Sequence, residues 1–202
     1  MRKPLILVLS SLALLLLPSC SPRDFLTRRL AADLIARSET FRVPRQLLLR
    51  TGVITNDDYL SPESLALQHR GWISGTRTSC PLSLVPPPCW QVILTPSGVD
   101  TFHTLVVPGD ADKTSFSIPA ARRELVAITG IAKQGNVADV EFSWRWVALN
   151  EVGAAVFPSD LRYRSTASFR WYDDGWRVVG RGSSSHRGQP LDEALKNAEP
   201  AQ

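Results

Sequence analysis

Long apolar runs, histidine and a strong excess of one charge are all scarce in this sequence. Its 202 residues include three histidines, three cysteines and one methionine, and 23 basic side chains against 19 acidic ones give a formal net charge of +4. A charge this small gives little reason to expect a nucleic-acid partner. The remaining composition is close to that of an average globular protein, which disfavours disorder, a coiled coil and a multi-span membrane protein.

Catalytic and metal-binding motifs are also missing from the sequence. It contains no Gly-x-Ser-x-Gly elbow, no His-Glu-x-x-His site and no phosphate-binding loop. His69 and His103 are not at zinc-finger spacing, and only one close cysteine pair exists. We therefore expect neither a metal nor a cofactor.

His103 supplies the one local candidate for acid–base chemistry, together with Asp100 and an acid such as Asp139 or Glu141. We expect residues 100–107 to form a strand, in which alternation places Asp100 and His103 on opposite faces. A general base must lie within hydrogen-bond reach of its partner. We therefore interpret His103 as a cross-strand or surface histidine and expect no enzymatic activity.

The N-terminus has the pattern of an export signal. The basic segment Met1–Lys3 precedes an apolar stretch from Leu5 to Leu17. As a helix this stretch would be about 20 Å long, too short for a hydrocarbon core of ~30 Å. Residues 1–19 are therefore predicted to be a secretory signal peptide.

The end of this segment, Leu17-Pro18-Ser19-Cys20, resembles the bacterial lipobox. The resemblance implies that Cys20 is lipidated and becomes the first residue after cleavage. Ordinary signal cleavage, which would leave Cys20 as a spare thiol, is the alternative. Several acyl chains would anchor the protein durably to membrane lipid in the cell envelope, facing the periplasm. Ser21 after the cysteine implies the outer membrane if the cell is Gram-negative.

Two further cysteines bracket a proline-rich segment. Cys80 and Cys89 are close in sequence, and in an oxidising envelope such a pair predicts a disulfide. Closing a loop of about ten residues would contribute about 2.7 kcal/mol of stability in the loop-entropy model. Trp72 and Trp90 flank this loop, and either would be a candidate binding hot spot if it were exposed.

Two helices are expected in the first half of the chain. Ser21 and a following proline predict the start of an amphipathic helix over 22–38. Its apolar stripe could pack on the domain, or its basic face could lie on anionic lipid beside the anchor; we favour packing on the domain. Ser61 predicts a second helix by the same logic, from Pro62 to Gly71.

The segment after the second helix resembles the last helix and wing of a winged-helix domain. The features that carry this resemblance are the exit Gly71-Trp72-Ile73, the long loop and the Leu-Thr-Pro-x-Gly end at Leu94–Gly98. For a chain expected outside the cytoplasm, the resemblance implies a scaffold for protein contact.

The second half of the chain has the patterning of an antiparallel sheet. Strands are predicted at 100–107, 122–133 and 137–149, with a turn at Gly135-Asn136. Apolar and polar residues alternate through 137–149, as in a half-buried strand. A final hairpin bends at Asp173-Asp174-Gly175, whose acids we interpret as turn formers and not as a cation site.

Three tryptophans are expected in the core of this sheet, Trp144, Trp146 and Trp171, because they share faces with phenylalanines of the same strands. The chain after Gly180 is rich in serine and glycine. We therefore predict a disordered tail over 182–202.

The segments Val137–Trp146 and Ala167–Val178, with their Asp-Gly turn and Trp-Arg-Val strand, resemble the closing strands of NTF2-like (cystatin-like α+β) domains. The resemblance implies an α+β fold in which an N-terminal amphipathic helix and a small helical region pack on an antiparallel β-sheet. The expected organisation is a helical region with the disulfide loop over 20–98 and the NTF2-like sheet over 99–181.

The function expected from these features is that of a membrane-tethered envelope lipoprotein, acting as a non-catalytic binding or assembly module. Its partners would be membrane lipid, through the acylated Cys20, and an envelope protein, with no nucleic acid involved. A small-molecule-binding or hydrolytic NTF2-like domain is the alternative. A cavity on the sheet's concave face that is lined by histidine or carboxylates would favour the small-molecule or hydrolytic domain. A concave face filled by tryptophan and phenylalanine would favour the non-catalytic module.

Overall fold

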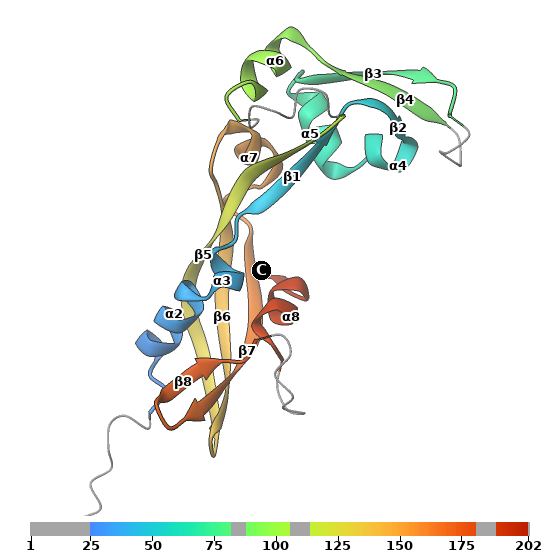
Figure 1. The fold of residues 1–202 in the computed structure, drawn as a ribbon. Helices are drawn as coiled ribbons and strands as arrows, with labels where there is room; N and C mark the ends of the chain where they lie inside the picture. The colour runs from blue at the N-terminus through green and yellow to red at the C-terminus, as the bar shows by residue number, and fades with distance from the viewer. Residues whose placement is uncertain (1–24, 82–87, 106–113, 181–188, 202) are drawn as a thin grey trace, which may run out of the picture.

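The computed structural model describes residues 25–81, 88–105, 114–180 and 189–201. The fold is α+β, as predicted. Figure 1 shows an elongated, bent molecule with a long curled sheet below and a smaller sheet with helices above. We call the long sheet with α2, α3 and α8 the body, and the small sheet with α4, α5 and α6 the head.

The long sheet is antiparallel and six-stranded. Its strands run in the order β1 (Arg45–Arg50), β5 (Ser115–Gln134), β6 (Val137–Ala148), β7 (Arg162–Tyr172) and β8 (Gly175–Val178), and β9 (Glu199–Ala201) also pairs with β7. β5 pairs with β1 through its first part and with β6 through the rest. Register shifts beside Val126 and Thr129 mark bulges, which bend a strand and increase its twist.

Predicted features of the sheet are largely confirmed. The turn at Gly135 is present, with φ of +62°, and so is the final hairpin, with φ of +131° at Gly175. β6 alternates between buried residues such as Phe142 and exposed ones such as Glu141. β5, however, begins at Ser115 instead of 122, because its first part pairs with β1.

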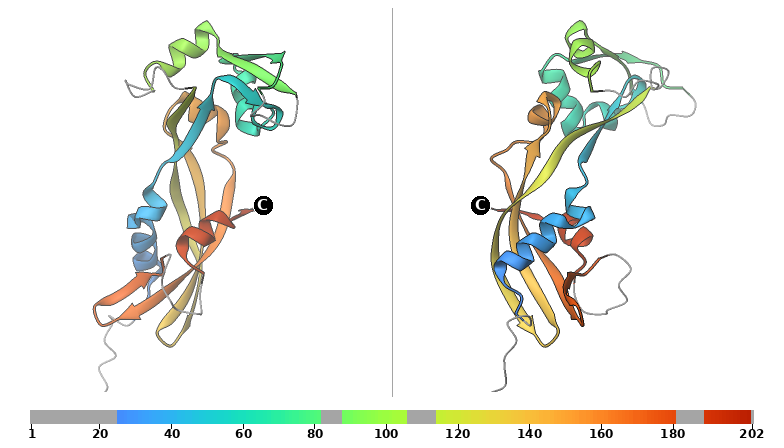
Figure 2. Two further views of the ribbon diagram at one scale, coloured as in Figure 1. Left: turned by 45° about the vertical axis from the view of Figure 1, so that its right-hand side comes forward. Right: turned by 60° about the vertical axis from the view of Figure 1, so that its left-hand side comes forward.

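The core of the body lies between the sheet and three helices. Helix α2 (Arg28–Arg37) packs against β5, and α8 (Leu191–Lys196) packs against β7 (Figure 2). The short helix α3 (Glu39–Arg42) contacts both α2 and α8. The buried residues of this core are Leu26, Ala31, Ile35, Phe41, Ile128, Ala138, Val140, Phe142, Trp144, Ala167, Phe169, Trp176, Leu191, Ala194 and Leu195.

The start of α2 differs from the prediction. The helix begins at Arg28 and not at 22, because the Thr27 side chain accepts a hydrogen bond from Leu30 N. The proposed cap Ser21 lies outside the described residues. Ala31 and Ile35 are fully buried in the body, which confirms that the apolar stripe packs on the domain.

The prediction of a disordered tail is wrong for residues 189–201. Leu191, Ala194 and Leu195 form a buried face at helical spacing, which the polar composition around them concealed. Backbone hydrogen bonds also attach the segment to the sheet. Ser168 N donates to Gln189 O at 3.0 Å, and β9 pairs with β7.

The head contains a three-stranded sheet and three short helices. The strands are β2 (Gly52–Thr55), β3 (Ile73–Thr78) and β4 (Cys89–Leu94), in the order β2-β4-β3, and the helices are α4 (Asn56–Tyr59), α5 (Pro62–His69) and α6 (Pro96–Phe102). Ser61 caps α5 as predicted, and the helix ends at His69. β3 and β4 form an antiparallel pair after α5, but β2 also pairs with β4, so the segment is part of a three-stranded sheet.

The strand predicted at 100–107 is wrong, since Pro96–Phe102 is a helix. The Thr95 side chain accepts a hydrogen bond from Gly98 N at 3.0 Å, and Pro96 occupies the first turn. Thr95 and Pro96 together are therefore a helix start signal, of the same kind as Ser61 and Pro62. His103 is the C-cap of this helix.

Close packing around Gly153, in helix α7 (Glu151–Val156), joins the head to the body. A Cβ at Gly153 would lie 1.8 Å from the Ala120 carbonyl oxygen, whereas a Cβ at Gly180 would meet nothing within 4 Å. Gly153→Ala should therefore lower the free energy of unfolding by about 1–3 kcal/mol or more. Gly180→Ala, the matched control, should change it little. Urea denaturation measures both, and equal midpoints would contradict the packing described.

The predicted disulfide is confirmed: Cys80 and Cys89 are bonded, with their Cα atoms 5.1 Å apart. Cys89 is fully buried at the start of β4. The bond restricts one local loop, so reduction should cost about 2.7 kcal/mol in the loop-entropy model and leave the long sheet folded. Mass spectrometry of non-reduced protein should show one internal bridge. Two free thiols in protein isolated from the cell would contradict this.

Candidate functional site: a groove at the waist

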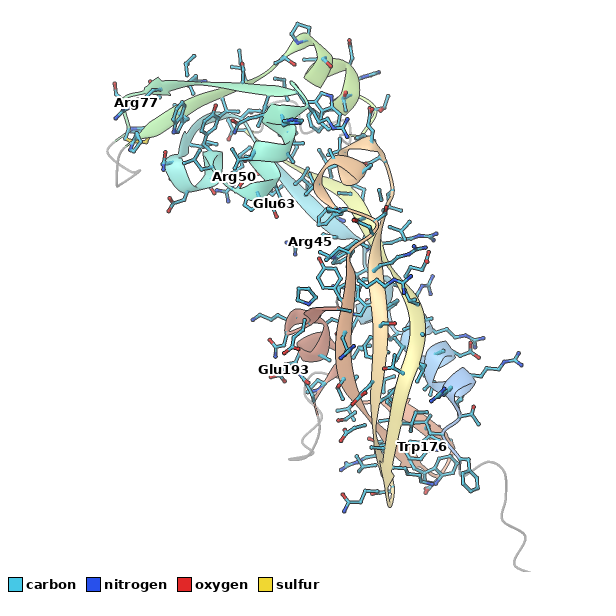
Figure 3. The ribbon with its side chains drawn as sticks, turned by 180° about the vertical axis from the view of Figure 1, so that it is seen from behind. Arg45, Arg50, Glu63, Arg77, Trp176 and Glu193 are labelled. Carbon is cyan, nitrogen blue, oxygen red and sulfur yellow. A yellow bond between two sulfur atoms is a disulfide. The ribbon has the colours of Figure 1, made fainter. Side chains whose placement is uncertain are left out.

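The concave side of the bend carries a pocket of about 460 Å³ between the head and α8. Figure 3 shows Glu63 on the head and Glu193 on α8 above and below this bend, with Arg45 between them. We call it the aromatic pocket. Its lining residues are Arg45, Pro62, Glu63, Trp144, Trp146, Val156, Phe157, Pro158, Leu161, Tyr163, Leu195, Lys196 and Ala198.

Four aromatic side chains build the wall of this pocket. Strand alternation puts Trp144 and Trp146 on one face of β6, where their rings meet edge to face at 5.2 Å. Tyr163 is opposite Trp144 in β7, and their rings stack at 4.6 Å. Phe157, which follows α7, approaches Trp146 at 5.6 Å. The cluster forms because the sheet pairing places these rings on adjacent strands.

The two tryptophans are not equivalent. Trp144 is 2% exposed, and its Nε1 donates to Ser165 Oγ at 3.0 Å. Trp146 is only half-buried, so the prediction that it lies wholly in the core is corrected. Trp171 is likewise half-buried and meets Trp176 edge to face at 5.8 Å.

Charged side chains surround the aromatic wall. Within the described ranges, Arg45, Glu63 and Lys196 form no ion pair or side-chain hydrogen bond. Arg123 lies against Trp146, with its guanidinium carbon 4.8 Å from the ring centroid. Burial lowers the pKa of the Arg123 guanidinium, and the neighbouring Arg45 cation lowers this pKa further.

Arg123 is incompletely satisfied by its surroundings. One guanidinium nitrogen donates to the Thr40 carbonyl oxygen at 3.0 Å. Its Nε is buried without a hydrogen-bond partner among the described residues. The Arg45 and Arg123 guanidinium groups are close enough for their charges to repel each other.

A second pocket of about 240 Å³ adjoins the first. All six residues of β1 line it, together with Asp58, Ser61, Glu63, Ser64, Leu67, Ile73 and Phe157. We call it the strand-edge pocket. Arg50 and Asp58, which both line this pocket, form an ion pair in which Arg50 Nη1 lies 2.6 Å from Asp58 Oδ2. Arg45, Glu63 and Phe157 line both pockets, which therefore form one waist groove.

The tryptophans singled out from the sequence lie in the head, outside this groove. Trp72 is 7% exposed and meets Phe102 edge to face at 6.0 Å, so it is a core residue and not a binding hot spot. Trp90 is half-buried, stacks on Tyr59 at 4.2 Å and donates to Asn56 Oδ1 at 3.1 Å. Both side chains are engaged in packing the head.

The acid–base candidate is not assembled. His103 Nδ1 lies 2.5 Å from the backbone carbonyl oxygen of Asp100, at the end of α6, and this contact does not involve the Asp100 carboxylate. Asp139 and Glu141 lie near the start of β6 in the body, whereas His103 lies in the head. The prediction that Asp100 and His103 lie on opposite faces of a strand is wrong, because Asp100 lies in α6 and His103 is the C-cap of that helix.

The described part of the chain contains no group of three or more His, Cys, Asp or Glu side chains placed to hold a metal ion. Its helices are each too short or too polar to cross a bilayer. Cys20 and the predicted signal peptide lie outside the described residues. The lipidation prediction therefore stays a prediction.

Sequence reasoning missed the groove. Its lining comes from six separate segments, and only the β6 alternation, with Trp144 and Trp146 on one face, is visible in the sequence. The fact that the core ends at Trp146 depends on where α8 and the head are placed.

Replacing each tryptophan of the wall by phenylalanine should separate a structural ring from a surface ring. Trp144→Phe removes the donor to Ser165, which is 6% exposed, and should cost about 1–3 kcal/mol. Trp146→Phe keeps an aromatic ring at a half-buried position and should cost less than about 1 kcal/mol. Thermal melts measure both. A larger loss of stability for Trp146→Phe than for Trp144→Phe would contradict the assignment of Trp144 as the buried ring and Trp146 as the surface ring.

The sequence and fold were also compared with known proteins. No protein-family model matches the chain. Neither curated proteins nor solved structures give a match. The groove itself, with its rings and charges, is therefore the basis for the functional argument.

Proposed function

We propose that this chain is a non-catalytic binding or assembly module, tethered to an envelope membrane through Cys20, and that the waist groove is its binding site. The observation that supports the proposal best is the half-buried aromatic wall of Trp146 and Tyr163. It is flanked by Arg45 and Lys196, which form no ion pair with any residue that the structure describes. Aromatic rings and arginine are the side chains that dominate binding hot spots.

The tether fits the position of the groove. Phe25, the first described residue, precedes α2, which begins at the lower end of the body in Figure 1. An anchor attached there would hold the groove and the head away from the membrane surface. The Cys80–Cys89 disulfide also agrees with an oxidising compartment, because such bonds are rare in reducing ones.

A small-molecule-binding domain of NTF2-like architecture is the second candidate. The curled sheet fits an NTF2-like fold, and the aromatic pocket on its concave side is the observation that favours this candidate. The hydrolytic form gains no support from His103, which lines neither pocket. The two candidates differ in the size of the occupant, which crosslinking measures.

Photo-crosslinking in living cells tests the binding function. A photoreactive amino acid at Leu161, which is 37% exposed in the aromatic pocket, should give a discrete higher-mass adduct. The same group at Val126, which is 36% exposed and lines neither pocket, is the matched control and should give none. Trp146→Ala should remove the Leu161 adduct. Equal labelling at both positions, or none at Leu161, would reject the groove as a protein-binding site.

The tether is tested separately. Cys20→Ala should release the protein from the membrane fraction or leave it uncleaved, with no incorporated fatty acid, because the acylated thiol is gone. Metabolic labelling with a fatty acid and fractionation measure this. Persistent labelling of the variant would refute lipidation at Cys20 without affecting the assignment of the groove.

A further inference from the structure

Strand β1 is an edge strand of the long sheet. Among the described strands it pairs with β5 alone, so one side of its backbone has no neighbouring strand within the part of the chain that the structure describes. All six of its residues line the strand-edge pocket. The outer edge of β1 therefore borders the waist groove.

The register shows which backbone groups lie at this outer edge. Thr51 N donates to Thr114 O at 2.8 Å, and the β1–β5 register continues from this pair. In an antiparallel ladder, hydrogen-bonded pairs alternate with pairs whose N–H and C=O groups point outward. Leu47 and Leu49 therefore bond to β5, whereas Gln46, Leu48 and Arg50 present their backbone groups to the outer edge. Pro119, which has no N–H, is opposite Gln46, as this alternation requires.

Features that would prevent another strand from pairing with β1 are found only at the two ends of the strand. Edge strands are usually guarded by charge, proline or a bulge. Pro44, Arg45 and the irregular register beside it guard one end of β1, and Arg50 guards the other. Between them the strand is uncharged, and the Leu48 side chain is 51% exposed. The middle of β1 is therefore open to pairing with another strand.

The charges along the groove limit what could pair there. Asp58 neutralises Arg50 through their ion pair. The other charged residues that line the groove are two basic ones, Arg45 and Lys196, and one acid, Glu63. An incoming chain with an acidic side chain would compensate this positive charge, and an apolar side chain beside it would fill the aromatic pocket.

We propose that the waist groove binds an extended, acidic peptide segment of another protein, which adds to the outer edge of β1 as a further strand. This proposal rests on the binding function above and names its ligand class. Backbone hydrogen bonds to Gln46, Leu48 and Arg50 supply the affinity, and the aromatic pocket with Arg45 and Lys196 supplies the preference for an apolar residue near an acid.

The probe is a displayed library of random linear peptides, selected on the full-length chain. The selected peptides should combine an aromatic or large apolar residue with an acid. Leu48→Pro removes the N–H at the outer edge without breaking the ladder to β5, and should weaken binding roughly tenfold or more. Leu48→Ala keeps that N–H and should bind nearly as the parent does. Gln46→Pro is a second test of the same kind, and melts verify that each variant is folded.

Backbone methylation of a selected peptide supplies an independent signature. Only alternate N–H groups of an added strand face β1, so N-methylation should abolish binding at every second position and be tolerated between them. Loss at every position, or at none, would overturn strand addition, as would equal binding by the Leu48→Pro and Leu48→Ala variants. Failure to select any peptide would also overturn it.

The outcomes for the two proposals are separable. If Leu48→Pro leaves binding intact while Trp146→Ala abolishes it, the groove binds by its aromatic pocket alone, and only the strand-addition proposal fails. If neither substitution affects the Leu161 crosslink, the groove is not the binding site and both proposals fail.

Discussion

One strand, β5, holds the head and the body together. Its first part pairs with β1 under the head, and its remaining part pairs with β6 in the body. Ala120 belongs to the core of the head, and its neighbour Ala121 is also fully buried. Gly153 of α7 approaches the Ala120 carbonyl oxygen because it has no Cβ, and Leu149 N donates to the same oxygen at 2.9 Å. Two cores therefore share one continuous backbone at the waist.

The groove is a consequence of this division. Each core is closed by its own helices, and the aromatic side chains between the two cores are covered only in part. Trp144 is on the covered side of the boundary and Trp146 on the open side, although they are two residues apart on the same face of β6. The same boundary leaves Arg45, Glu63 and Lys196 around the open rings without ion-pair partners in the described ranges. Rings that are exposed in part, and charges that have no ion-pair partner among the described residues, are available for a ligand.

Once Arg50 and Asp58 are paired, the charged residues that line this groove are Arg45 and Lys196 against Glu63. The neighbouring cations Arg123 and Arg45 repel each other, and the pKa of Arg123 is lowered by burial and by this repulsion. Contacts with Trp144 and Trp146 offset part of that cost, since a guanidinium is attracted to the face of an aromatic ring.

Local patterns in the sequence determined the helix at Pro62, the alternation of β6, the turns at Gly135 and Gly175 and the Cys80–Cys89 pairing, because each depends on residues close together along the chain. The helix at Pro96 was also encoded locally, by Thr95 and the proline itself, and was missed. Only the tertiary structure decided that Leu191–Lys196 is an ordered helix, that Trp72 is a core residue and that Trp146 lines a groove. Leu191, Ala194 and Leu195 do stand at helical spacing, but how completely each of these side chains is covered depends on distant segments, which a local pattern does not specify.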